Sequence, residues 1–356
     1  MRVAIIGAGV MGCATALSLA ERGVDAVMLE RAVPGAEASS AAAGILGAQV
    51  ELHGRTKDLA LFVRARHAWK AWASALREAS GIDIGYRTSG VLRVGRSDGE
   101  GVDLEQEVQW QNAQGLRAFL LNAKEAREIE PELTARVIAA AHFPDDAQVD
   151  PPALLRALMA ALTRSERTTV HSGRTVLELL VEHDHCVGVK LDDGDLRADA
   201  VVLAAGSWSS LVRGVPSTLP TISPVRGQIV LLDERPPRVR SIVFGAGGYV
   251  VPRGDGRVLC GSTTEHAGFR KEVTASGMHG ILDLAMACVP SLGAARVAGM
   301  WSNFRPHVDG ERALVGRSPL PGLFLATGHY RNGILLAKVT ADEVAGAVLT
   351  GEPAPD

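Results

Sequence analysis

The stretch Arg2-Val3-Ala4-Ile5-Ile6-Gly7-Ala8-Gly9-Val10-Met11-Gly12 decides the fold. Its apolar residues 3–6 predict a short buried strand, and the glycines that follow lead into a helix-like run that reaches Arg22. A second apolar run, residues 26–29, predicts another strand that ends at Glu30. The order of strand, glycine turn, helix and strand predicts a βαβ unit that begins at residue 2.

The glycines of this unit have the spacing of a pyrophosphate-binding turn. Gly7 permits the tight turn, Gly9 lets the backbone approach a ligand, and Gly12 lets the helix lie close to the sheet. The N-terminus of the helix offers free N–H groups and partial positive charge to an anion. Glu30 lies where an acidic residue can accept hydrogen bonds from both ribose hydroxyls. We therefore expect an adenine dinucleotide, NAD or FAD, and a purely structural glycine turn is the alternative.

Length and charge limit the function classes. The 356 residues exceed the usual size of one hydrophobic core, so two domains are expected. Hydrophobic residues make up 47% and charged residues 22%, which is typical of a globular protein. Thirty-seven Lys and Arg residues face 40 Asp and Glu residues, a net charge of -3, so no overall positive field favours nucleic acid or an anionic membrane.

Cysteine spacing and hydropathy indicate the compartment. Cys13, Cys186, Cys260 and Cys288 form no CxxC pair, so we expect neither a metal site nor a disulfide framework. No run reaches the ~18–20 apolar residues of a membrane helix. The apolar run at the N-terminus is broken too early for a signal peptide. We expect a cytoplasmic protein without membrane insertion, with homo-oligomerisation left open.

The remaining patterns alternate strands and helices at both ends of the chain and cluster strands in the middle. We expect an α/β fold in which a Rossmann-type domain is interleaved with a smaller substrate domain rich in antiparallel sheet. The expected dinucleotide domain comprises residues 1–85, 148–220 and 300–356, and the substrate domain 86–147 and 221–299. Predicted helices cover 58–80, 100–115, a segment opened by Asp150-Pro151-Pro152, and a last helix that reaches 349 with Gly351 as its stop; predicted strands include 91–94, 168–171, 176–182, 187–191 and 201–204.

A segment in the middle of the chain favours FAD over NAD. Residues 197–206 end in the small residues Ala204-Ala205-Gly206 and resemble the second fingerprint of FAD proteins, in which a strand ends beside the flavin ribityl chain. An NAD-dependent dehydrogenase does not need this feature. Some FAD-dependent oxidases attach the flavin through a cysteine near the C-terminus. No cysteine follows Cys288 here, so comparison with them implies noncovalent FAD.

Further motifs resemble the D-amino acid oxidase (DAO) superfamily of FAD-dependent oxidoreductases, and among its members most of all the glycine oxidases of thiamine biosynthesis. They are residues 39–49 (SSAAAGILGAQ), 224–228 (PVRGQ), 249–253 (YVVPR), 256–258 (GRV), 304–306 (FRP), 309–310 (DG) and 327–337 (TGHYRNGILLA). These motifs follow the family's order along the whole chain. The resemblance implies a FAD domain beside an antiparallel sheet that roofs the substrate cavity.

The resemblance also implies residue roles. Arg305 would clamp the substrate carboxylate in a bidentate manner and Tyr249 would donate its hydroxyl to the same group, while Arg331 and Ala48 would line the substrate site. We do not expect His329 to act as a base. The residues implied to bind FAD are Gly7, Ala8, Gly9, Val10, Met11, Gly12, Glu30, Arg31, Ser39, Ser40, Ala42, Ala43, Gly44, Ile45, Leu46, Val176, Ala205, Gly206, Trp208, Arg305, His329, Tyr330, Arg331, Asn332, Gly333, Ile334 and Leu335.

The implied reaction is oxidative deamination of a small amino acid or N-methyl amino acid such as glycine, sarcosine or D-alanine. A hydride would pass from the α-carbon to flavin N5, and molecular oxygen would then yield hydrogen peroxide. A dehydrogenase of the same fold that passes electrons to a quinone or a protein is one alternative, and a noncatalytic FAD-binding protein is another. Polar residues at 263–265, 303, 307 and 311–312 depart from the family's pattern and leave the side-chain specificity open.

Overall fold

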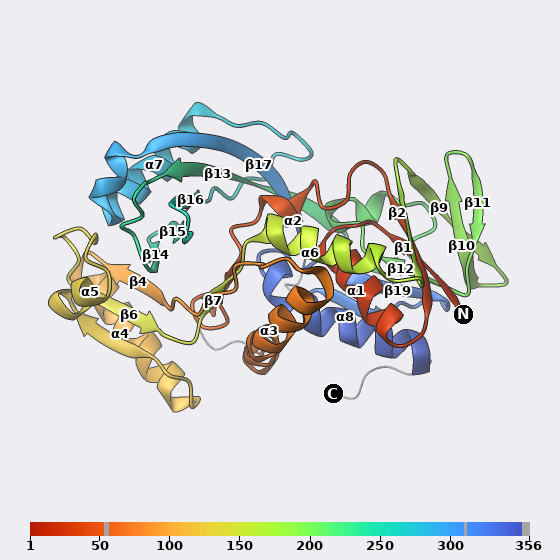
Figure 1. Cartoon of the computed structure of the whole chain (residues 1–356), viewed down its shortest axis with the longest axis horizontal. Helices are drawn as coiled ribbons and strands as arrows, with labels where there is room; N and C mark the ends of the chain where they lie inside the picture. The colour runs from red at the N-terminus through yellow and green to blue at the C-terminus, as the bar shows by residue number, and fades with distance from the viewer. Residues whose placement is uncertain (53–56, 310–311, 351–356) are drawn as a thin grey trace.

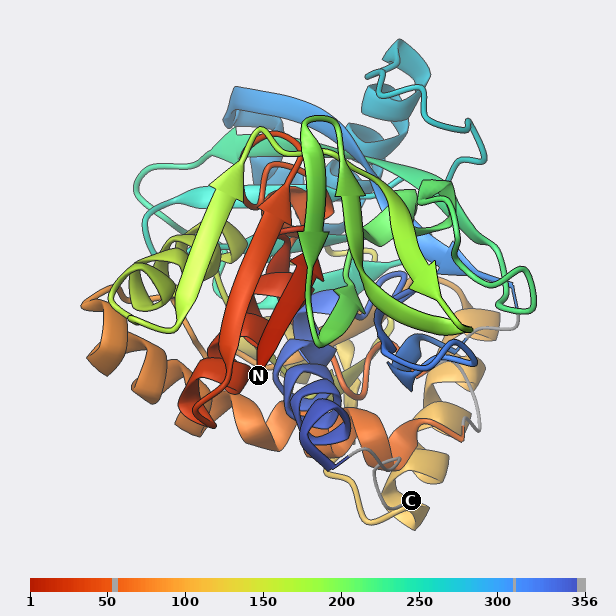
Figure 2. The same cartoon turned by 90° about the vertical axis from the view of Figure 1, so that its right-hand side faces the viewer.

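A computed structural model describes residues 1–52, 57–309 and 312–350 of the chain (Figures 1 and 2). Its first layer is a six-stranded sheet whose strand order is β18-β19-β12-β1-β2-β8. The five strands from β19 to β8 are parallel, and β18 is antiparallel at one edge. The bounds are β1 Arg2–Ile6, β2 Asp25–Glu30, β8 Thr168–Ser172, β12 Ala200–Leu203, β18 Leu314–Arg317 and β19 Leu323–Thr327.

Successive residues of the central strands supply two separate hydrophobic cores. Ile5 packs among the helices on one face, whereas Ile6 packs against a three-stranded sheet on the other. Figure 2 shows this small sheet in front of the parallel one. The helices are α1 Val10–Glu21, α3 Leu59–Ser80, α6 Pro151–Thr163 and α8 Gly333–Thr350, and the small sheet comprises β9 Val176–Glu182, β10 His185–Leu191 and β11 Gly194–Arg197.

The second large unit is an eight-stranded sheet with the order β17-β13-β16-β15-β14-β4-β6-β5, and it occupies the left of Figure 1. All its pairs are antiparallel except that of β14 and β4. Its strands are β4 Val91–Gly95, β5 Phe119–Asn122, β6 Ala139–Phe143, β13 Ile222–Asp233, β14 Ile242–Gly245, β15 Gly248–Pro252, β16 Arg257–Gly261 and β17 Arg296–Val308; α4 Asp98–Ala113, α5 Ala123–Ile129 and α7 Ala275–Cys288 flank it.

Short elements complete the chain and connect the two large units. A two-stranded sheet pairs a segment beyond the first dinucleotide-binding turn with the segment before α6. These elements are α2 Ala38–Ala41, β3 Ile45–Leu46, β7 Ala147–Gln148, and the 3₁₀ helices η1 Gly206–Leu211 and η2 Pro290–Ala294. The expected domain boundary after residue 299 falls within β17, which continues across it as a single strand.

The helices predicted from sequence periodicity are confirmed. The helix expected over residues 58–80 is α3, and Gly81 ends it in the left-handed conformation. Asp150 caps α6 by accepting a hydrogen bond from the Ala153 N–H. Trp69 is fully buried, as expected of a core residue. The sequence patterns did not predict α7 or β17, and the expected stop at Gly351 lies outside the described residues.

A buried carboxylate holds residues 47–52, which follow β3. Asp146 is fully buried, and its oxygens accept hydrogen bonds from the backbone N–H groups of Gln49 and Val50. The guanidinium of Arg66 on α3 forms an ion pair with it at 3.0 Å. Burial raises the pKa of Asp146 to about 6, although the Val50 N–H and Arg66 both act to lower it. This carboxylate therefore joins α3, the 47–52 loop and the turn between β6 and β7.

Replacing Asp146 by Ala should destabilise the protein strongly. The change leaves Arg66 without its buried counter-charge, which typically costs about 3–5 kcal/mol. The control is Glu128→Ala, which breaks the exposed Lys124–Glu128 pair and should cost about 0–1 kcal/mol. Denaturant unfolding of the flavin-loaded protein measures both changes. Equal stabilities for the two variants would show that Asp146 does not hold the loop.

Candidate active site

A cavity of about 940 Å³ lies between the parallel sheet and the eight-stranded sheet. Residues at the carboxyl ends of β1, β2, β12 and β19 line it, which is where open α/β sheets bind ligands. The opposite wall comes from β13, β14, β15 and β17. The volume lies at the upper end of the usual ~300–1,000 Å³ range for small-molecule sites, so the cavity suits a large cofactor together with a small substrate.

The turn after β1 has the close backbone packing of a pyrophosphate site. Gly7 has φ +99°, and a Cβ added there would lie 2.6 Å from the carbonyl oxygen of Ala204. A Cβ on Gly12 would lie 2.0 Å from the carbonyl oxygen of Gly7. Gly9 is the N-cap of α1 and supplies no side-chain cap; the Val10 N–H donates to the Oγ of Ser39 at 2.9 Å, and Val10 and Met11 of the first turn line the cavity. This geometry fits the pyrophosphate of a dinucleotide.

Glu30 lies at the end of β2, where a ribose would be bound. Its Oε2 accepts a hydrogen bond of 2.9 Å from the Ala8 N–H, and its Oε1 accepts one of 3.0 Å from the Ala32 N–H. These bonds orient the carboxylate in the wall of the cavity. An ionised carboxylate has about four acceptor sites, so two remain for ribose hydroxyls.

A stacked pair extends this wall beyond Glu30. The guanidinium carbon of Arg31 lies 3.8 Å from the ring centroid of Trp208, and Arg31 also pairs with Glu37 at 2.8 Å. Phe269 packs on the same indole, with ring centroids 5.3 Å apart. A flat cationic and aromatic surface of this kind can accommodate the planar part of a nucleotide.

Most residues predicted to bind the cofactor or the substrate line this one cavity. They are Gly7, Gly9, Val10, Met11, Glu30, Arg31, Ser39, Ala42, Ala43, Gly44, Ile45, Val176, Ala205, Gly206, Trp208, Tyr249, Arg305, His329, Tyr330, Arg331, Asn332, Gly333 and Ile334. Six predicted residues are not among those that line it: Ala8, Gly12, Ser40, Leu46, Ala48 and Leu335. Four of these, Ala8, Leu46, Ala48 and Leu335, are buried in the hydrophobic core beside the helices.

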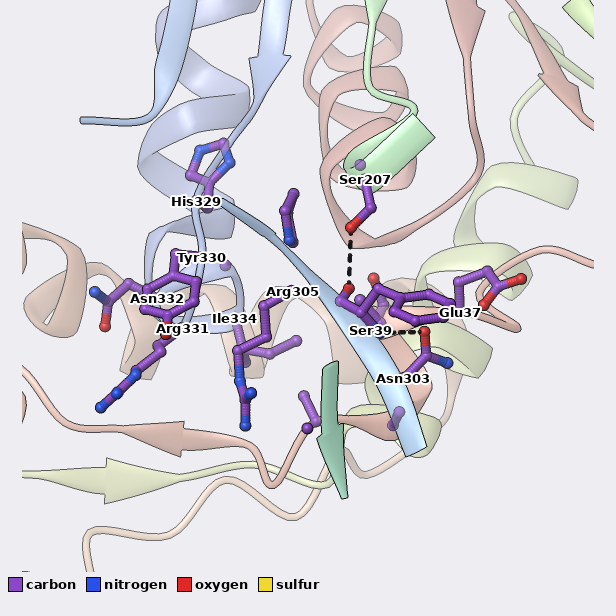
Figure 3. A pocket seen from close by; sticks show the side chains of 18 of the residues that line it. Glu37, Ser39, Ser207, Asn303, Arg305, His329, Tyr330, Arg331, Asn332 and Ile334 are labelled. Atoms are coloured by element: carbon purple, nitrogen blue, oxygen red, sulfur yellow. Dashed lines mark hydrogen bonds between the residues drawn. The ribbon is translucent and has the colours of Figure 1, made fainter. Parts of the chain in front are cut away.

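Arg305 reaches the cavity from β17 (Figure 3). Its Nη1 donates to the carbonyl oxygen of Thr263 at 3.1 Å, and its Nη2 donates to the Oγ of Ser262 at 2.5 Å. The guanidinium lies against Gly227 of β13, where an added Cβ would be 2.3 Å from Nη1. Both hydrogen-bond acceptors are neutral, so Arg305 keeps its positive charge available for an anionic ligand.

Tyr249 on β15 lies near Arg305 in the same wall. Burial raises the pKa of its phenol, while Arg305 and a hydrogen bond with Ser262 act to lower it. The phenol therefore remains protonated at neutral pH and can donate a hydrogen bond. Ser262 therefore contacts both predicted substrate-binding side chains.

His329 is a buried neutral residue at the start of the last motif. Burial lowers its pKa to about 3, and its Nε2 lies 3.0 Å from the Oγ1 of Thr340 on α8. The next residue, Tyr330, has φ 49° and donates its N–H to the carbonyl oxygen of Pro306. The His329–Thr340 contact thus holds the turn that leads into α8. A neutral imidazole bonded in this way agrees with the expectation that His329 is not a base.

Sequence reasoning missed three residues that line the cavity next to Arg305 or Arg331: Gly227, Ser262 and Glu51. Gly227 lies in the 224–228 motif, but only its position under Arg305 gives it a role. Ser262 follows the predicted roofing strand directly. Strand alternation would place it on the same face as the buried Cys260, so no local pattern indicated that its side chain lines the cavity. Glu51 lies two residues beyond the predicted flavin-facing segment and lines the cavity. The presence of an acidic residue so close to the predicted flavin-facing segment could have indicated that Glu51 lines the cavity.

The fold and the site define a flavin-dependent oxidoreductase: a dinucleotide-binding α/β sheet faces a second sheet, and an arginine of that second sheet lines the cavity between them. Comparison with known proteins supports this class. The chain belongs to the DAO family, because the family model described as FAD dependent oxidoreductase matches residues 2–347. Among the described residues no helix is long and apolar enough to cross a membrane, and no cluster of His, Cys, Asp and Glu could hold a metal.

Individual relatives match over nearly the whole chain. A glycine oxidase of Geobacillus kaustophilus is 34% identical to this chain, and the alignment covers 99% of this chain and 94% of that protein. The crystal structure of glycine oxidase from Geobacillus kaustophilus superposes with a TM-score of 0.94, which covers 100% of this chain and 96% of the chain in that structure. A bifunctional protein ThiO/ThiG of Trichormus variabilis is 33% identical over 99% of this chain but only 53% of its own length. The crystal structure of iminodiacetate oxidase from Chelativorans sp. BNC1 has a TM-score of 0.89 at 26% identity, covering 100% of this chain and 97% of its own.

Replacing Gly12 by Ala should abolish FAD retention. The new methyl group would overlap the carbonyl oxygen of Gly7 and push α1 away from the turn. The matched control is Gly346→Ala on α8, where an added Cβ has nothing within 4 Å. The control should keep its FAD and gain up to about 1 kcal/mol in stability. Flavin absorbance per protein after gel filtration measures retention, and a Gly12→Ala variant with a full complement of FAD would refute this geometry.

Proposed function

We propose that the protein oxidises glycine, sarcosine or a similarly small amino acid with FAD as its cofactor. The observation that carries this proposal is the position of Arg305, which faces the dinucleotide cavity with neutral hydrogen-bond partners only. The similarity to glycine oxidases over the whole chain supports the same substrate class. The product is an imine, which water hydrolyses to an oxo acid and ammonia, or to an oxo acid and methylamine when sarcosine is the substrate.

The roles of the substrate-binding residues follow from charge and hydrogen bonding. Arg305 holds the substrate carboxylate, since a planar guanidinium matches a carboxylate in a bidentate manner. Tyr249 donates its hydroxyl to the same carboxylate. Ser262 keeps these two donors at a fixed spacing. Together they fix the carboxylate end of the substrate and so decide where its α-carbon lies, which is the main contribution of positioning to catalysis.

FAD would be held by the Gly7–Gly12 turn, Glu30, the 39–46 segment and the 328–334 loop. When bound, it accepts the hydride released from the α-carbon of the substrate. The N-terminus of α8 lies in the cavity wall at Gly333 and Ile334, where its partial positive charge stabilises negative charge. The substrate amine must be neutral for its lone pair to assist hydride loss. No base from the protein is required for this step, in keeping with the neutral, bonded state of His329.

Noncovalent attachment of FAD agrees with the cysteines of the chain. All four are buried, and none lines the cavity. Burial raises the pKa of Cys13 and of Cys260 to about 12, with a smaller rise from Glu30 and from Cys288 respectively, so both thiols stay protonated and unreactive.

We further propose that molecular oxygen reoxidises the flavin and that the imine serves thiamine thiazole synthesis. The similarity to one half of a ThiO/ThiG fusion protein supports this role. The alternative acceptor is a quinone or a second protein. Hydrogen peroxide formed in equal amount to the glycine consumed supports the oxidase. Rapid anaerobic reduction of the flavin by glycine, followed by slow reoxidation in air, would instead indicate a dehydrogenase.

Replacing Arg305 by Ala should leave FAD bound but nearly abolish flavin reduction by amino acids. Loss of the charge pair costs about 2–5 kcal/mol of substrate binding. The control is Arg296→Ala on the same strand, because Arg296 is exposed and pairs with Asp233 at the surface. Stopped-flow flavin reduction without oxygen, with glycine, sarcosine and D-alanine, provides the measurement. Equal rates for the parent and Arg305→Ala would refute the carboxylate clamp.

Replacing Tyr249 by Phe should have a milder effect than the loss of Arg305. It removes one neutral donor, which is worth about 0.5–1.5 kcal/mol, so the dissociation constant for glycine should rise by roughly three- to tenfold. The same anaerobic experiment yields this constant from the concentration dependence of the reduction rate. A loss as large as that of Arg305→Ala would give Tyr249 a role beyond carboxylate binding.

A further inference from the structure

Two guanidinium groups reach the substrate end of the cavity. Arg305 arrives from β17, and Arg331 arrives from the loop before α8; Figure 3 shows both side chains extending toward the same side of the site. Two cations in one small site would suit a substrate with two carboxylates. The inference rests on the proposed function, whose glycine-type substrate carries only one carboxylate.

Glu51 resolves this mismatch in charge. Its carboxylate lines the same cavity, its side chain is only 15% exposed, and its Oε2 lies 3.8 Å from Nη1 of Arg331. Arg305 differs from Arg331 in this respect. Within residues 1–52, 57–309 and 312–350, no carboxylate forms an ion pair with Arg305, whose acceptors are a serine hydroxyl and a backbone carbonyl.

Glu51, Arg305 and Arg331 all influence the hydroxyl of Tyr249. The pKa of its phenol is raised first by burial and also by Glu51, whereas Arg305 and Arg331 lower it. Glu51, Arg305 and Arg331 are thus the charged groups that act on the Tyr249 hydroxyl, and all of them line the same cavity as Tyr249. The pair of Glu51 and Arg331 contributes no net charge, which leaves Arg305 as the one uncompensated cation among these groups.

We propose that Glu51 is a specificity-determining residue that restricts the site to substrates with a single carboxylate. It neutralises Arg331, so a second carboxylate on the substrate finds no free cation and meets the negative charge of Glu51. Amino acids such as glycine and sarcosine satisfy this restriction. Dicarboxylic amines such as iminodiacetate and aspartate do not.

The test measures ligand binding, which does not depend on turnover. The two ligands are acetate, which carries one carboxylate, and malonate, which carries two on a similar carbon frame. Each is titrated into the flavin-loaded protein, and calorimetry gives its dissociation constant. The parent should bind acetate more tightly than malonate. Glu51→Gln frees Arg331 and should improve malonate binding by about tenfold, with a smaller gain for acetate.

Three further variants separate this effect from a general loss of negative charge. Asp103→Asn removes a carboxylate from the same cavity wall on α4 and should leave the preference for acetate unchanged. Glu51→Asp keeps the charge and should behave like the parent. Glu51→Gln combined with Arg331→Gln should lose the gain in malonate binding, because the freed cation is then absent.

Several results would overturn the proposal. The proposal is wrong if the parent protein binds malonate more tightly than acetate. It is also wrong if a folded Glu51→Gln variant binds malonate with the same affinity as the parent. A similar gain in Asp103→Asn, or in the double variant, would show that Arg331 is not the residue released. Failure of the proposed function would give a different result. No amino acid would then reduce the flavin of the parent protein, whereas the titrations would still show that acetate binds more tightly than malonate.

Discussion

The pairing of β13 with β17 is the interaction on which the active site depends. These strands pair antiparallel along their whole length, with Val225 opposite Arg305 and Gly227 opposite Asn303. The pairing brings the C-terminal part of the chain into a sheet that is otherwise built from the middle of the sequence. It also places Arg305 over Gly227, the one residue type that leaves room for the guanidinium. Without this register, the Arg305 guanidinium, which we propose to bind the substrate carboxylate, would not face the cavity.

The other wall of the site is set by backbone packing rather than by charge. Gly7 and Gly12 let β1, α1 and β12 approach so closely that the helix N-terminus meets the cavity directly. On the opposite side, Asp146 holds the 47–52 loop from which Glu51 projects. Asp146, a buried carboxylate that does not itself line the cavity, therefore positions Glu51, a carboxylate that does. Its loss would be expected to disturb both stability and substrate selection.

The sequence predicted the parts of the molecule that depend on local patterns. The glycine turn, Glu30 and the helices α1, α3 and α6 were predictable because glycine spacing, helical periodicity and capping residues act over a few positions. Arg305 and Tyr249 were found through a resemblance to known motifs, and both line the cavity. Their mutual contact through Ser262 was not predictable, since it joins a residue of β15, the residue directly after β16 and a residue of β17, and no local pattern specifies the register of these strands. The ion pair of Glu51 with Arg331 spans 280 positions of the chain for the same reason.

The central claim is that one cavity holds both the flavin and the carboxylate end of the substrate, with Arg305 between the two sheets as its anchor. A crystal structure of the flavin-loaded protein with glycolate, which resembles glycine but lacks the amine, tests this claim most directly. The account predicts the FAD pyrophosphate at the N-terminus of α1, with the glycolate carboxylate bonded to Arg305 and Tyr249 beside the flavin ring. Glycolate bound elsewhere, or a flavin ring outside this cavity, would contradict it.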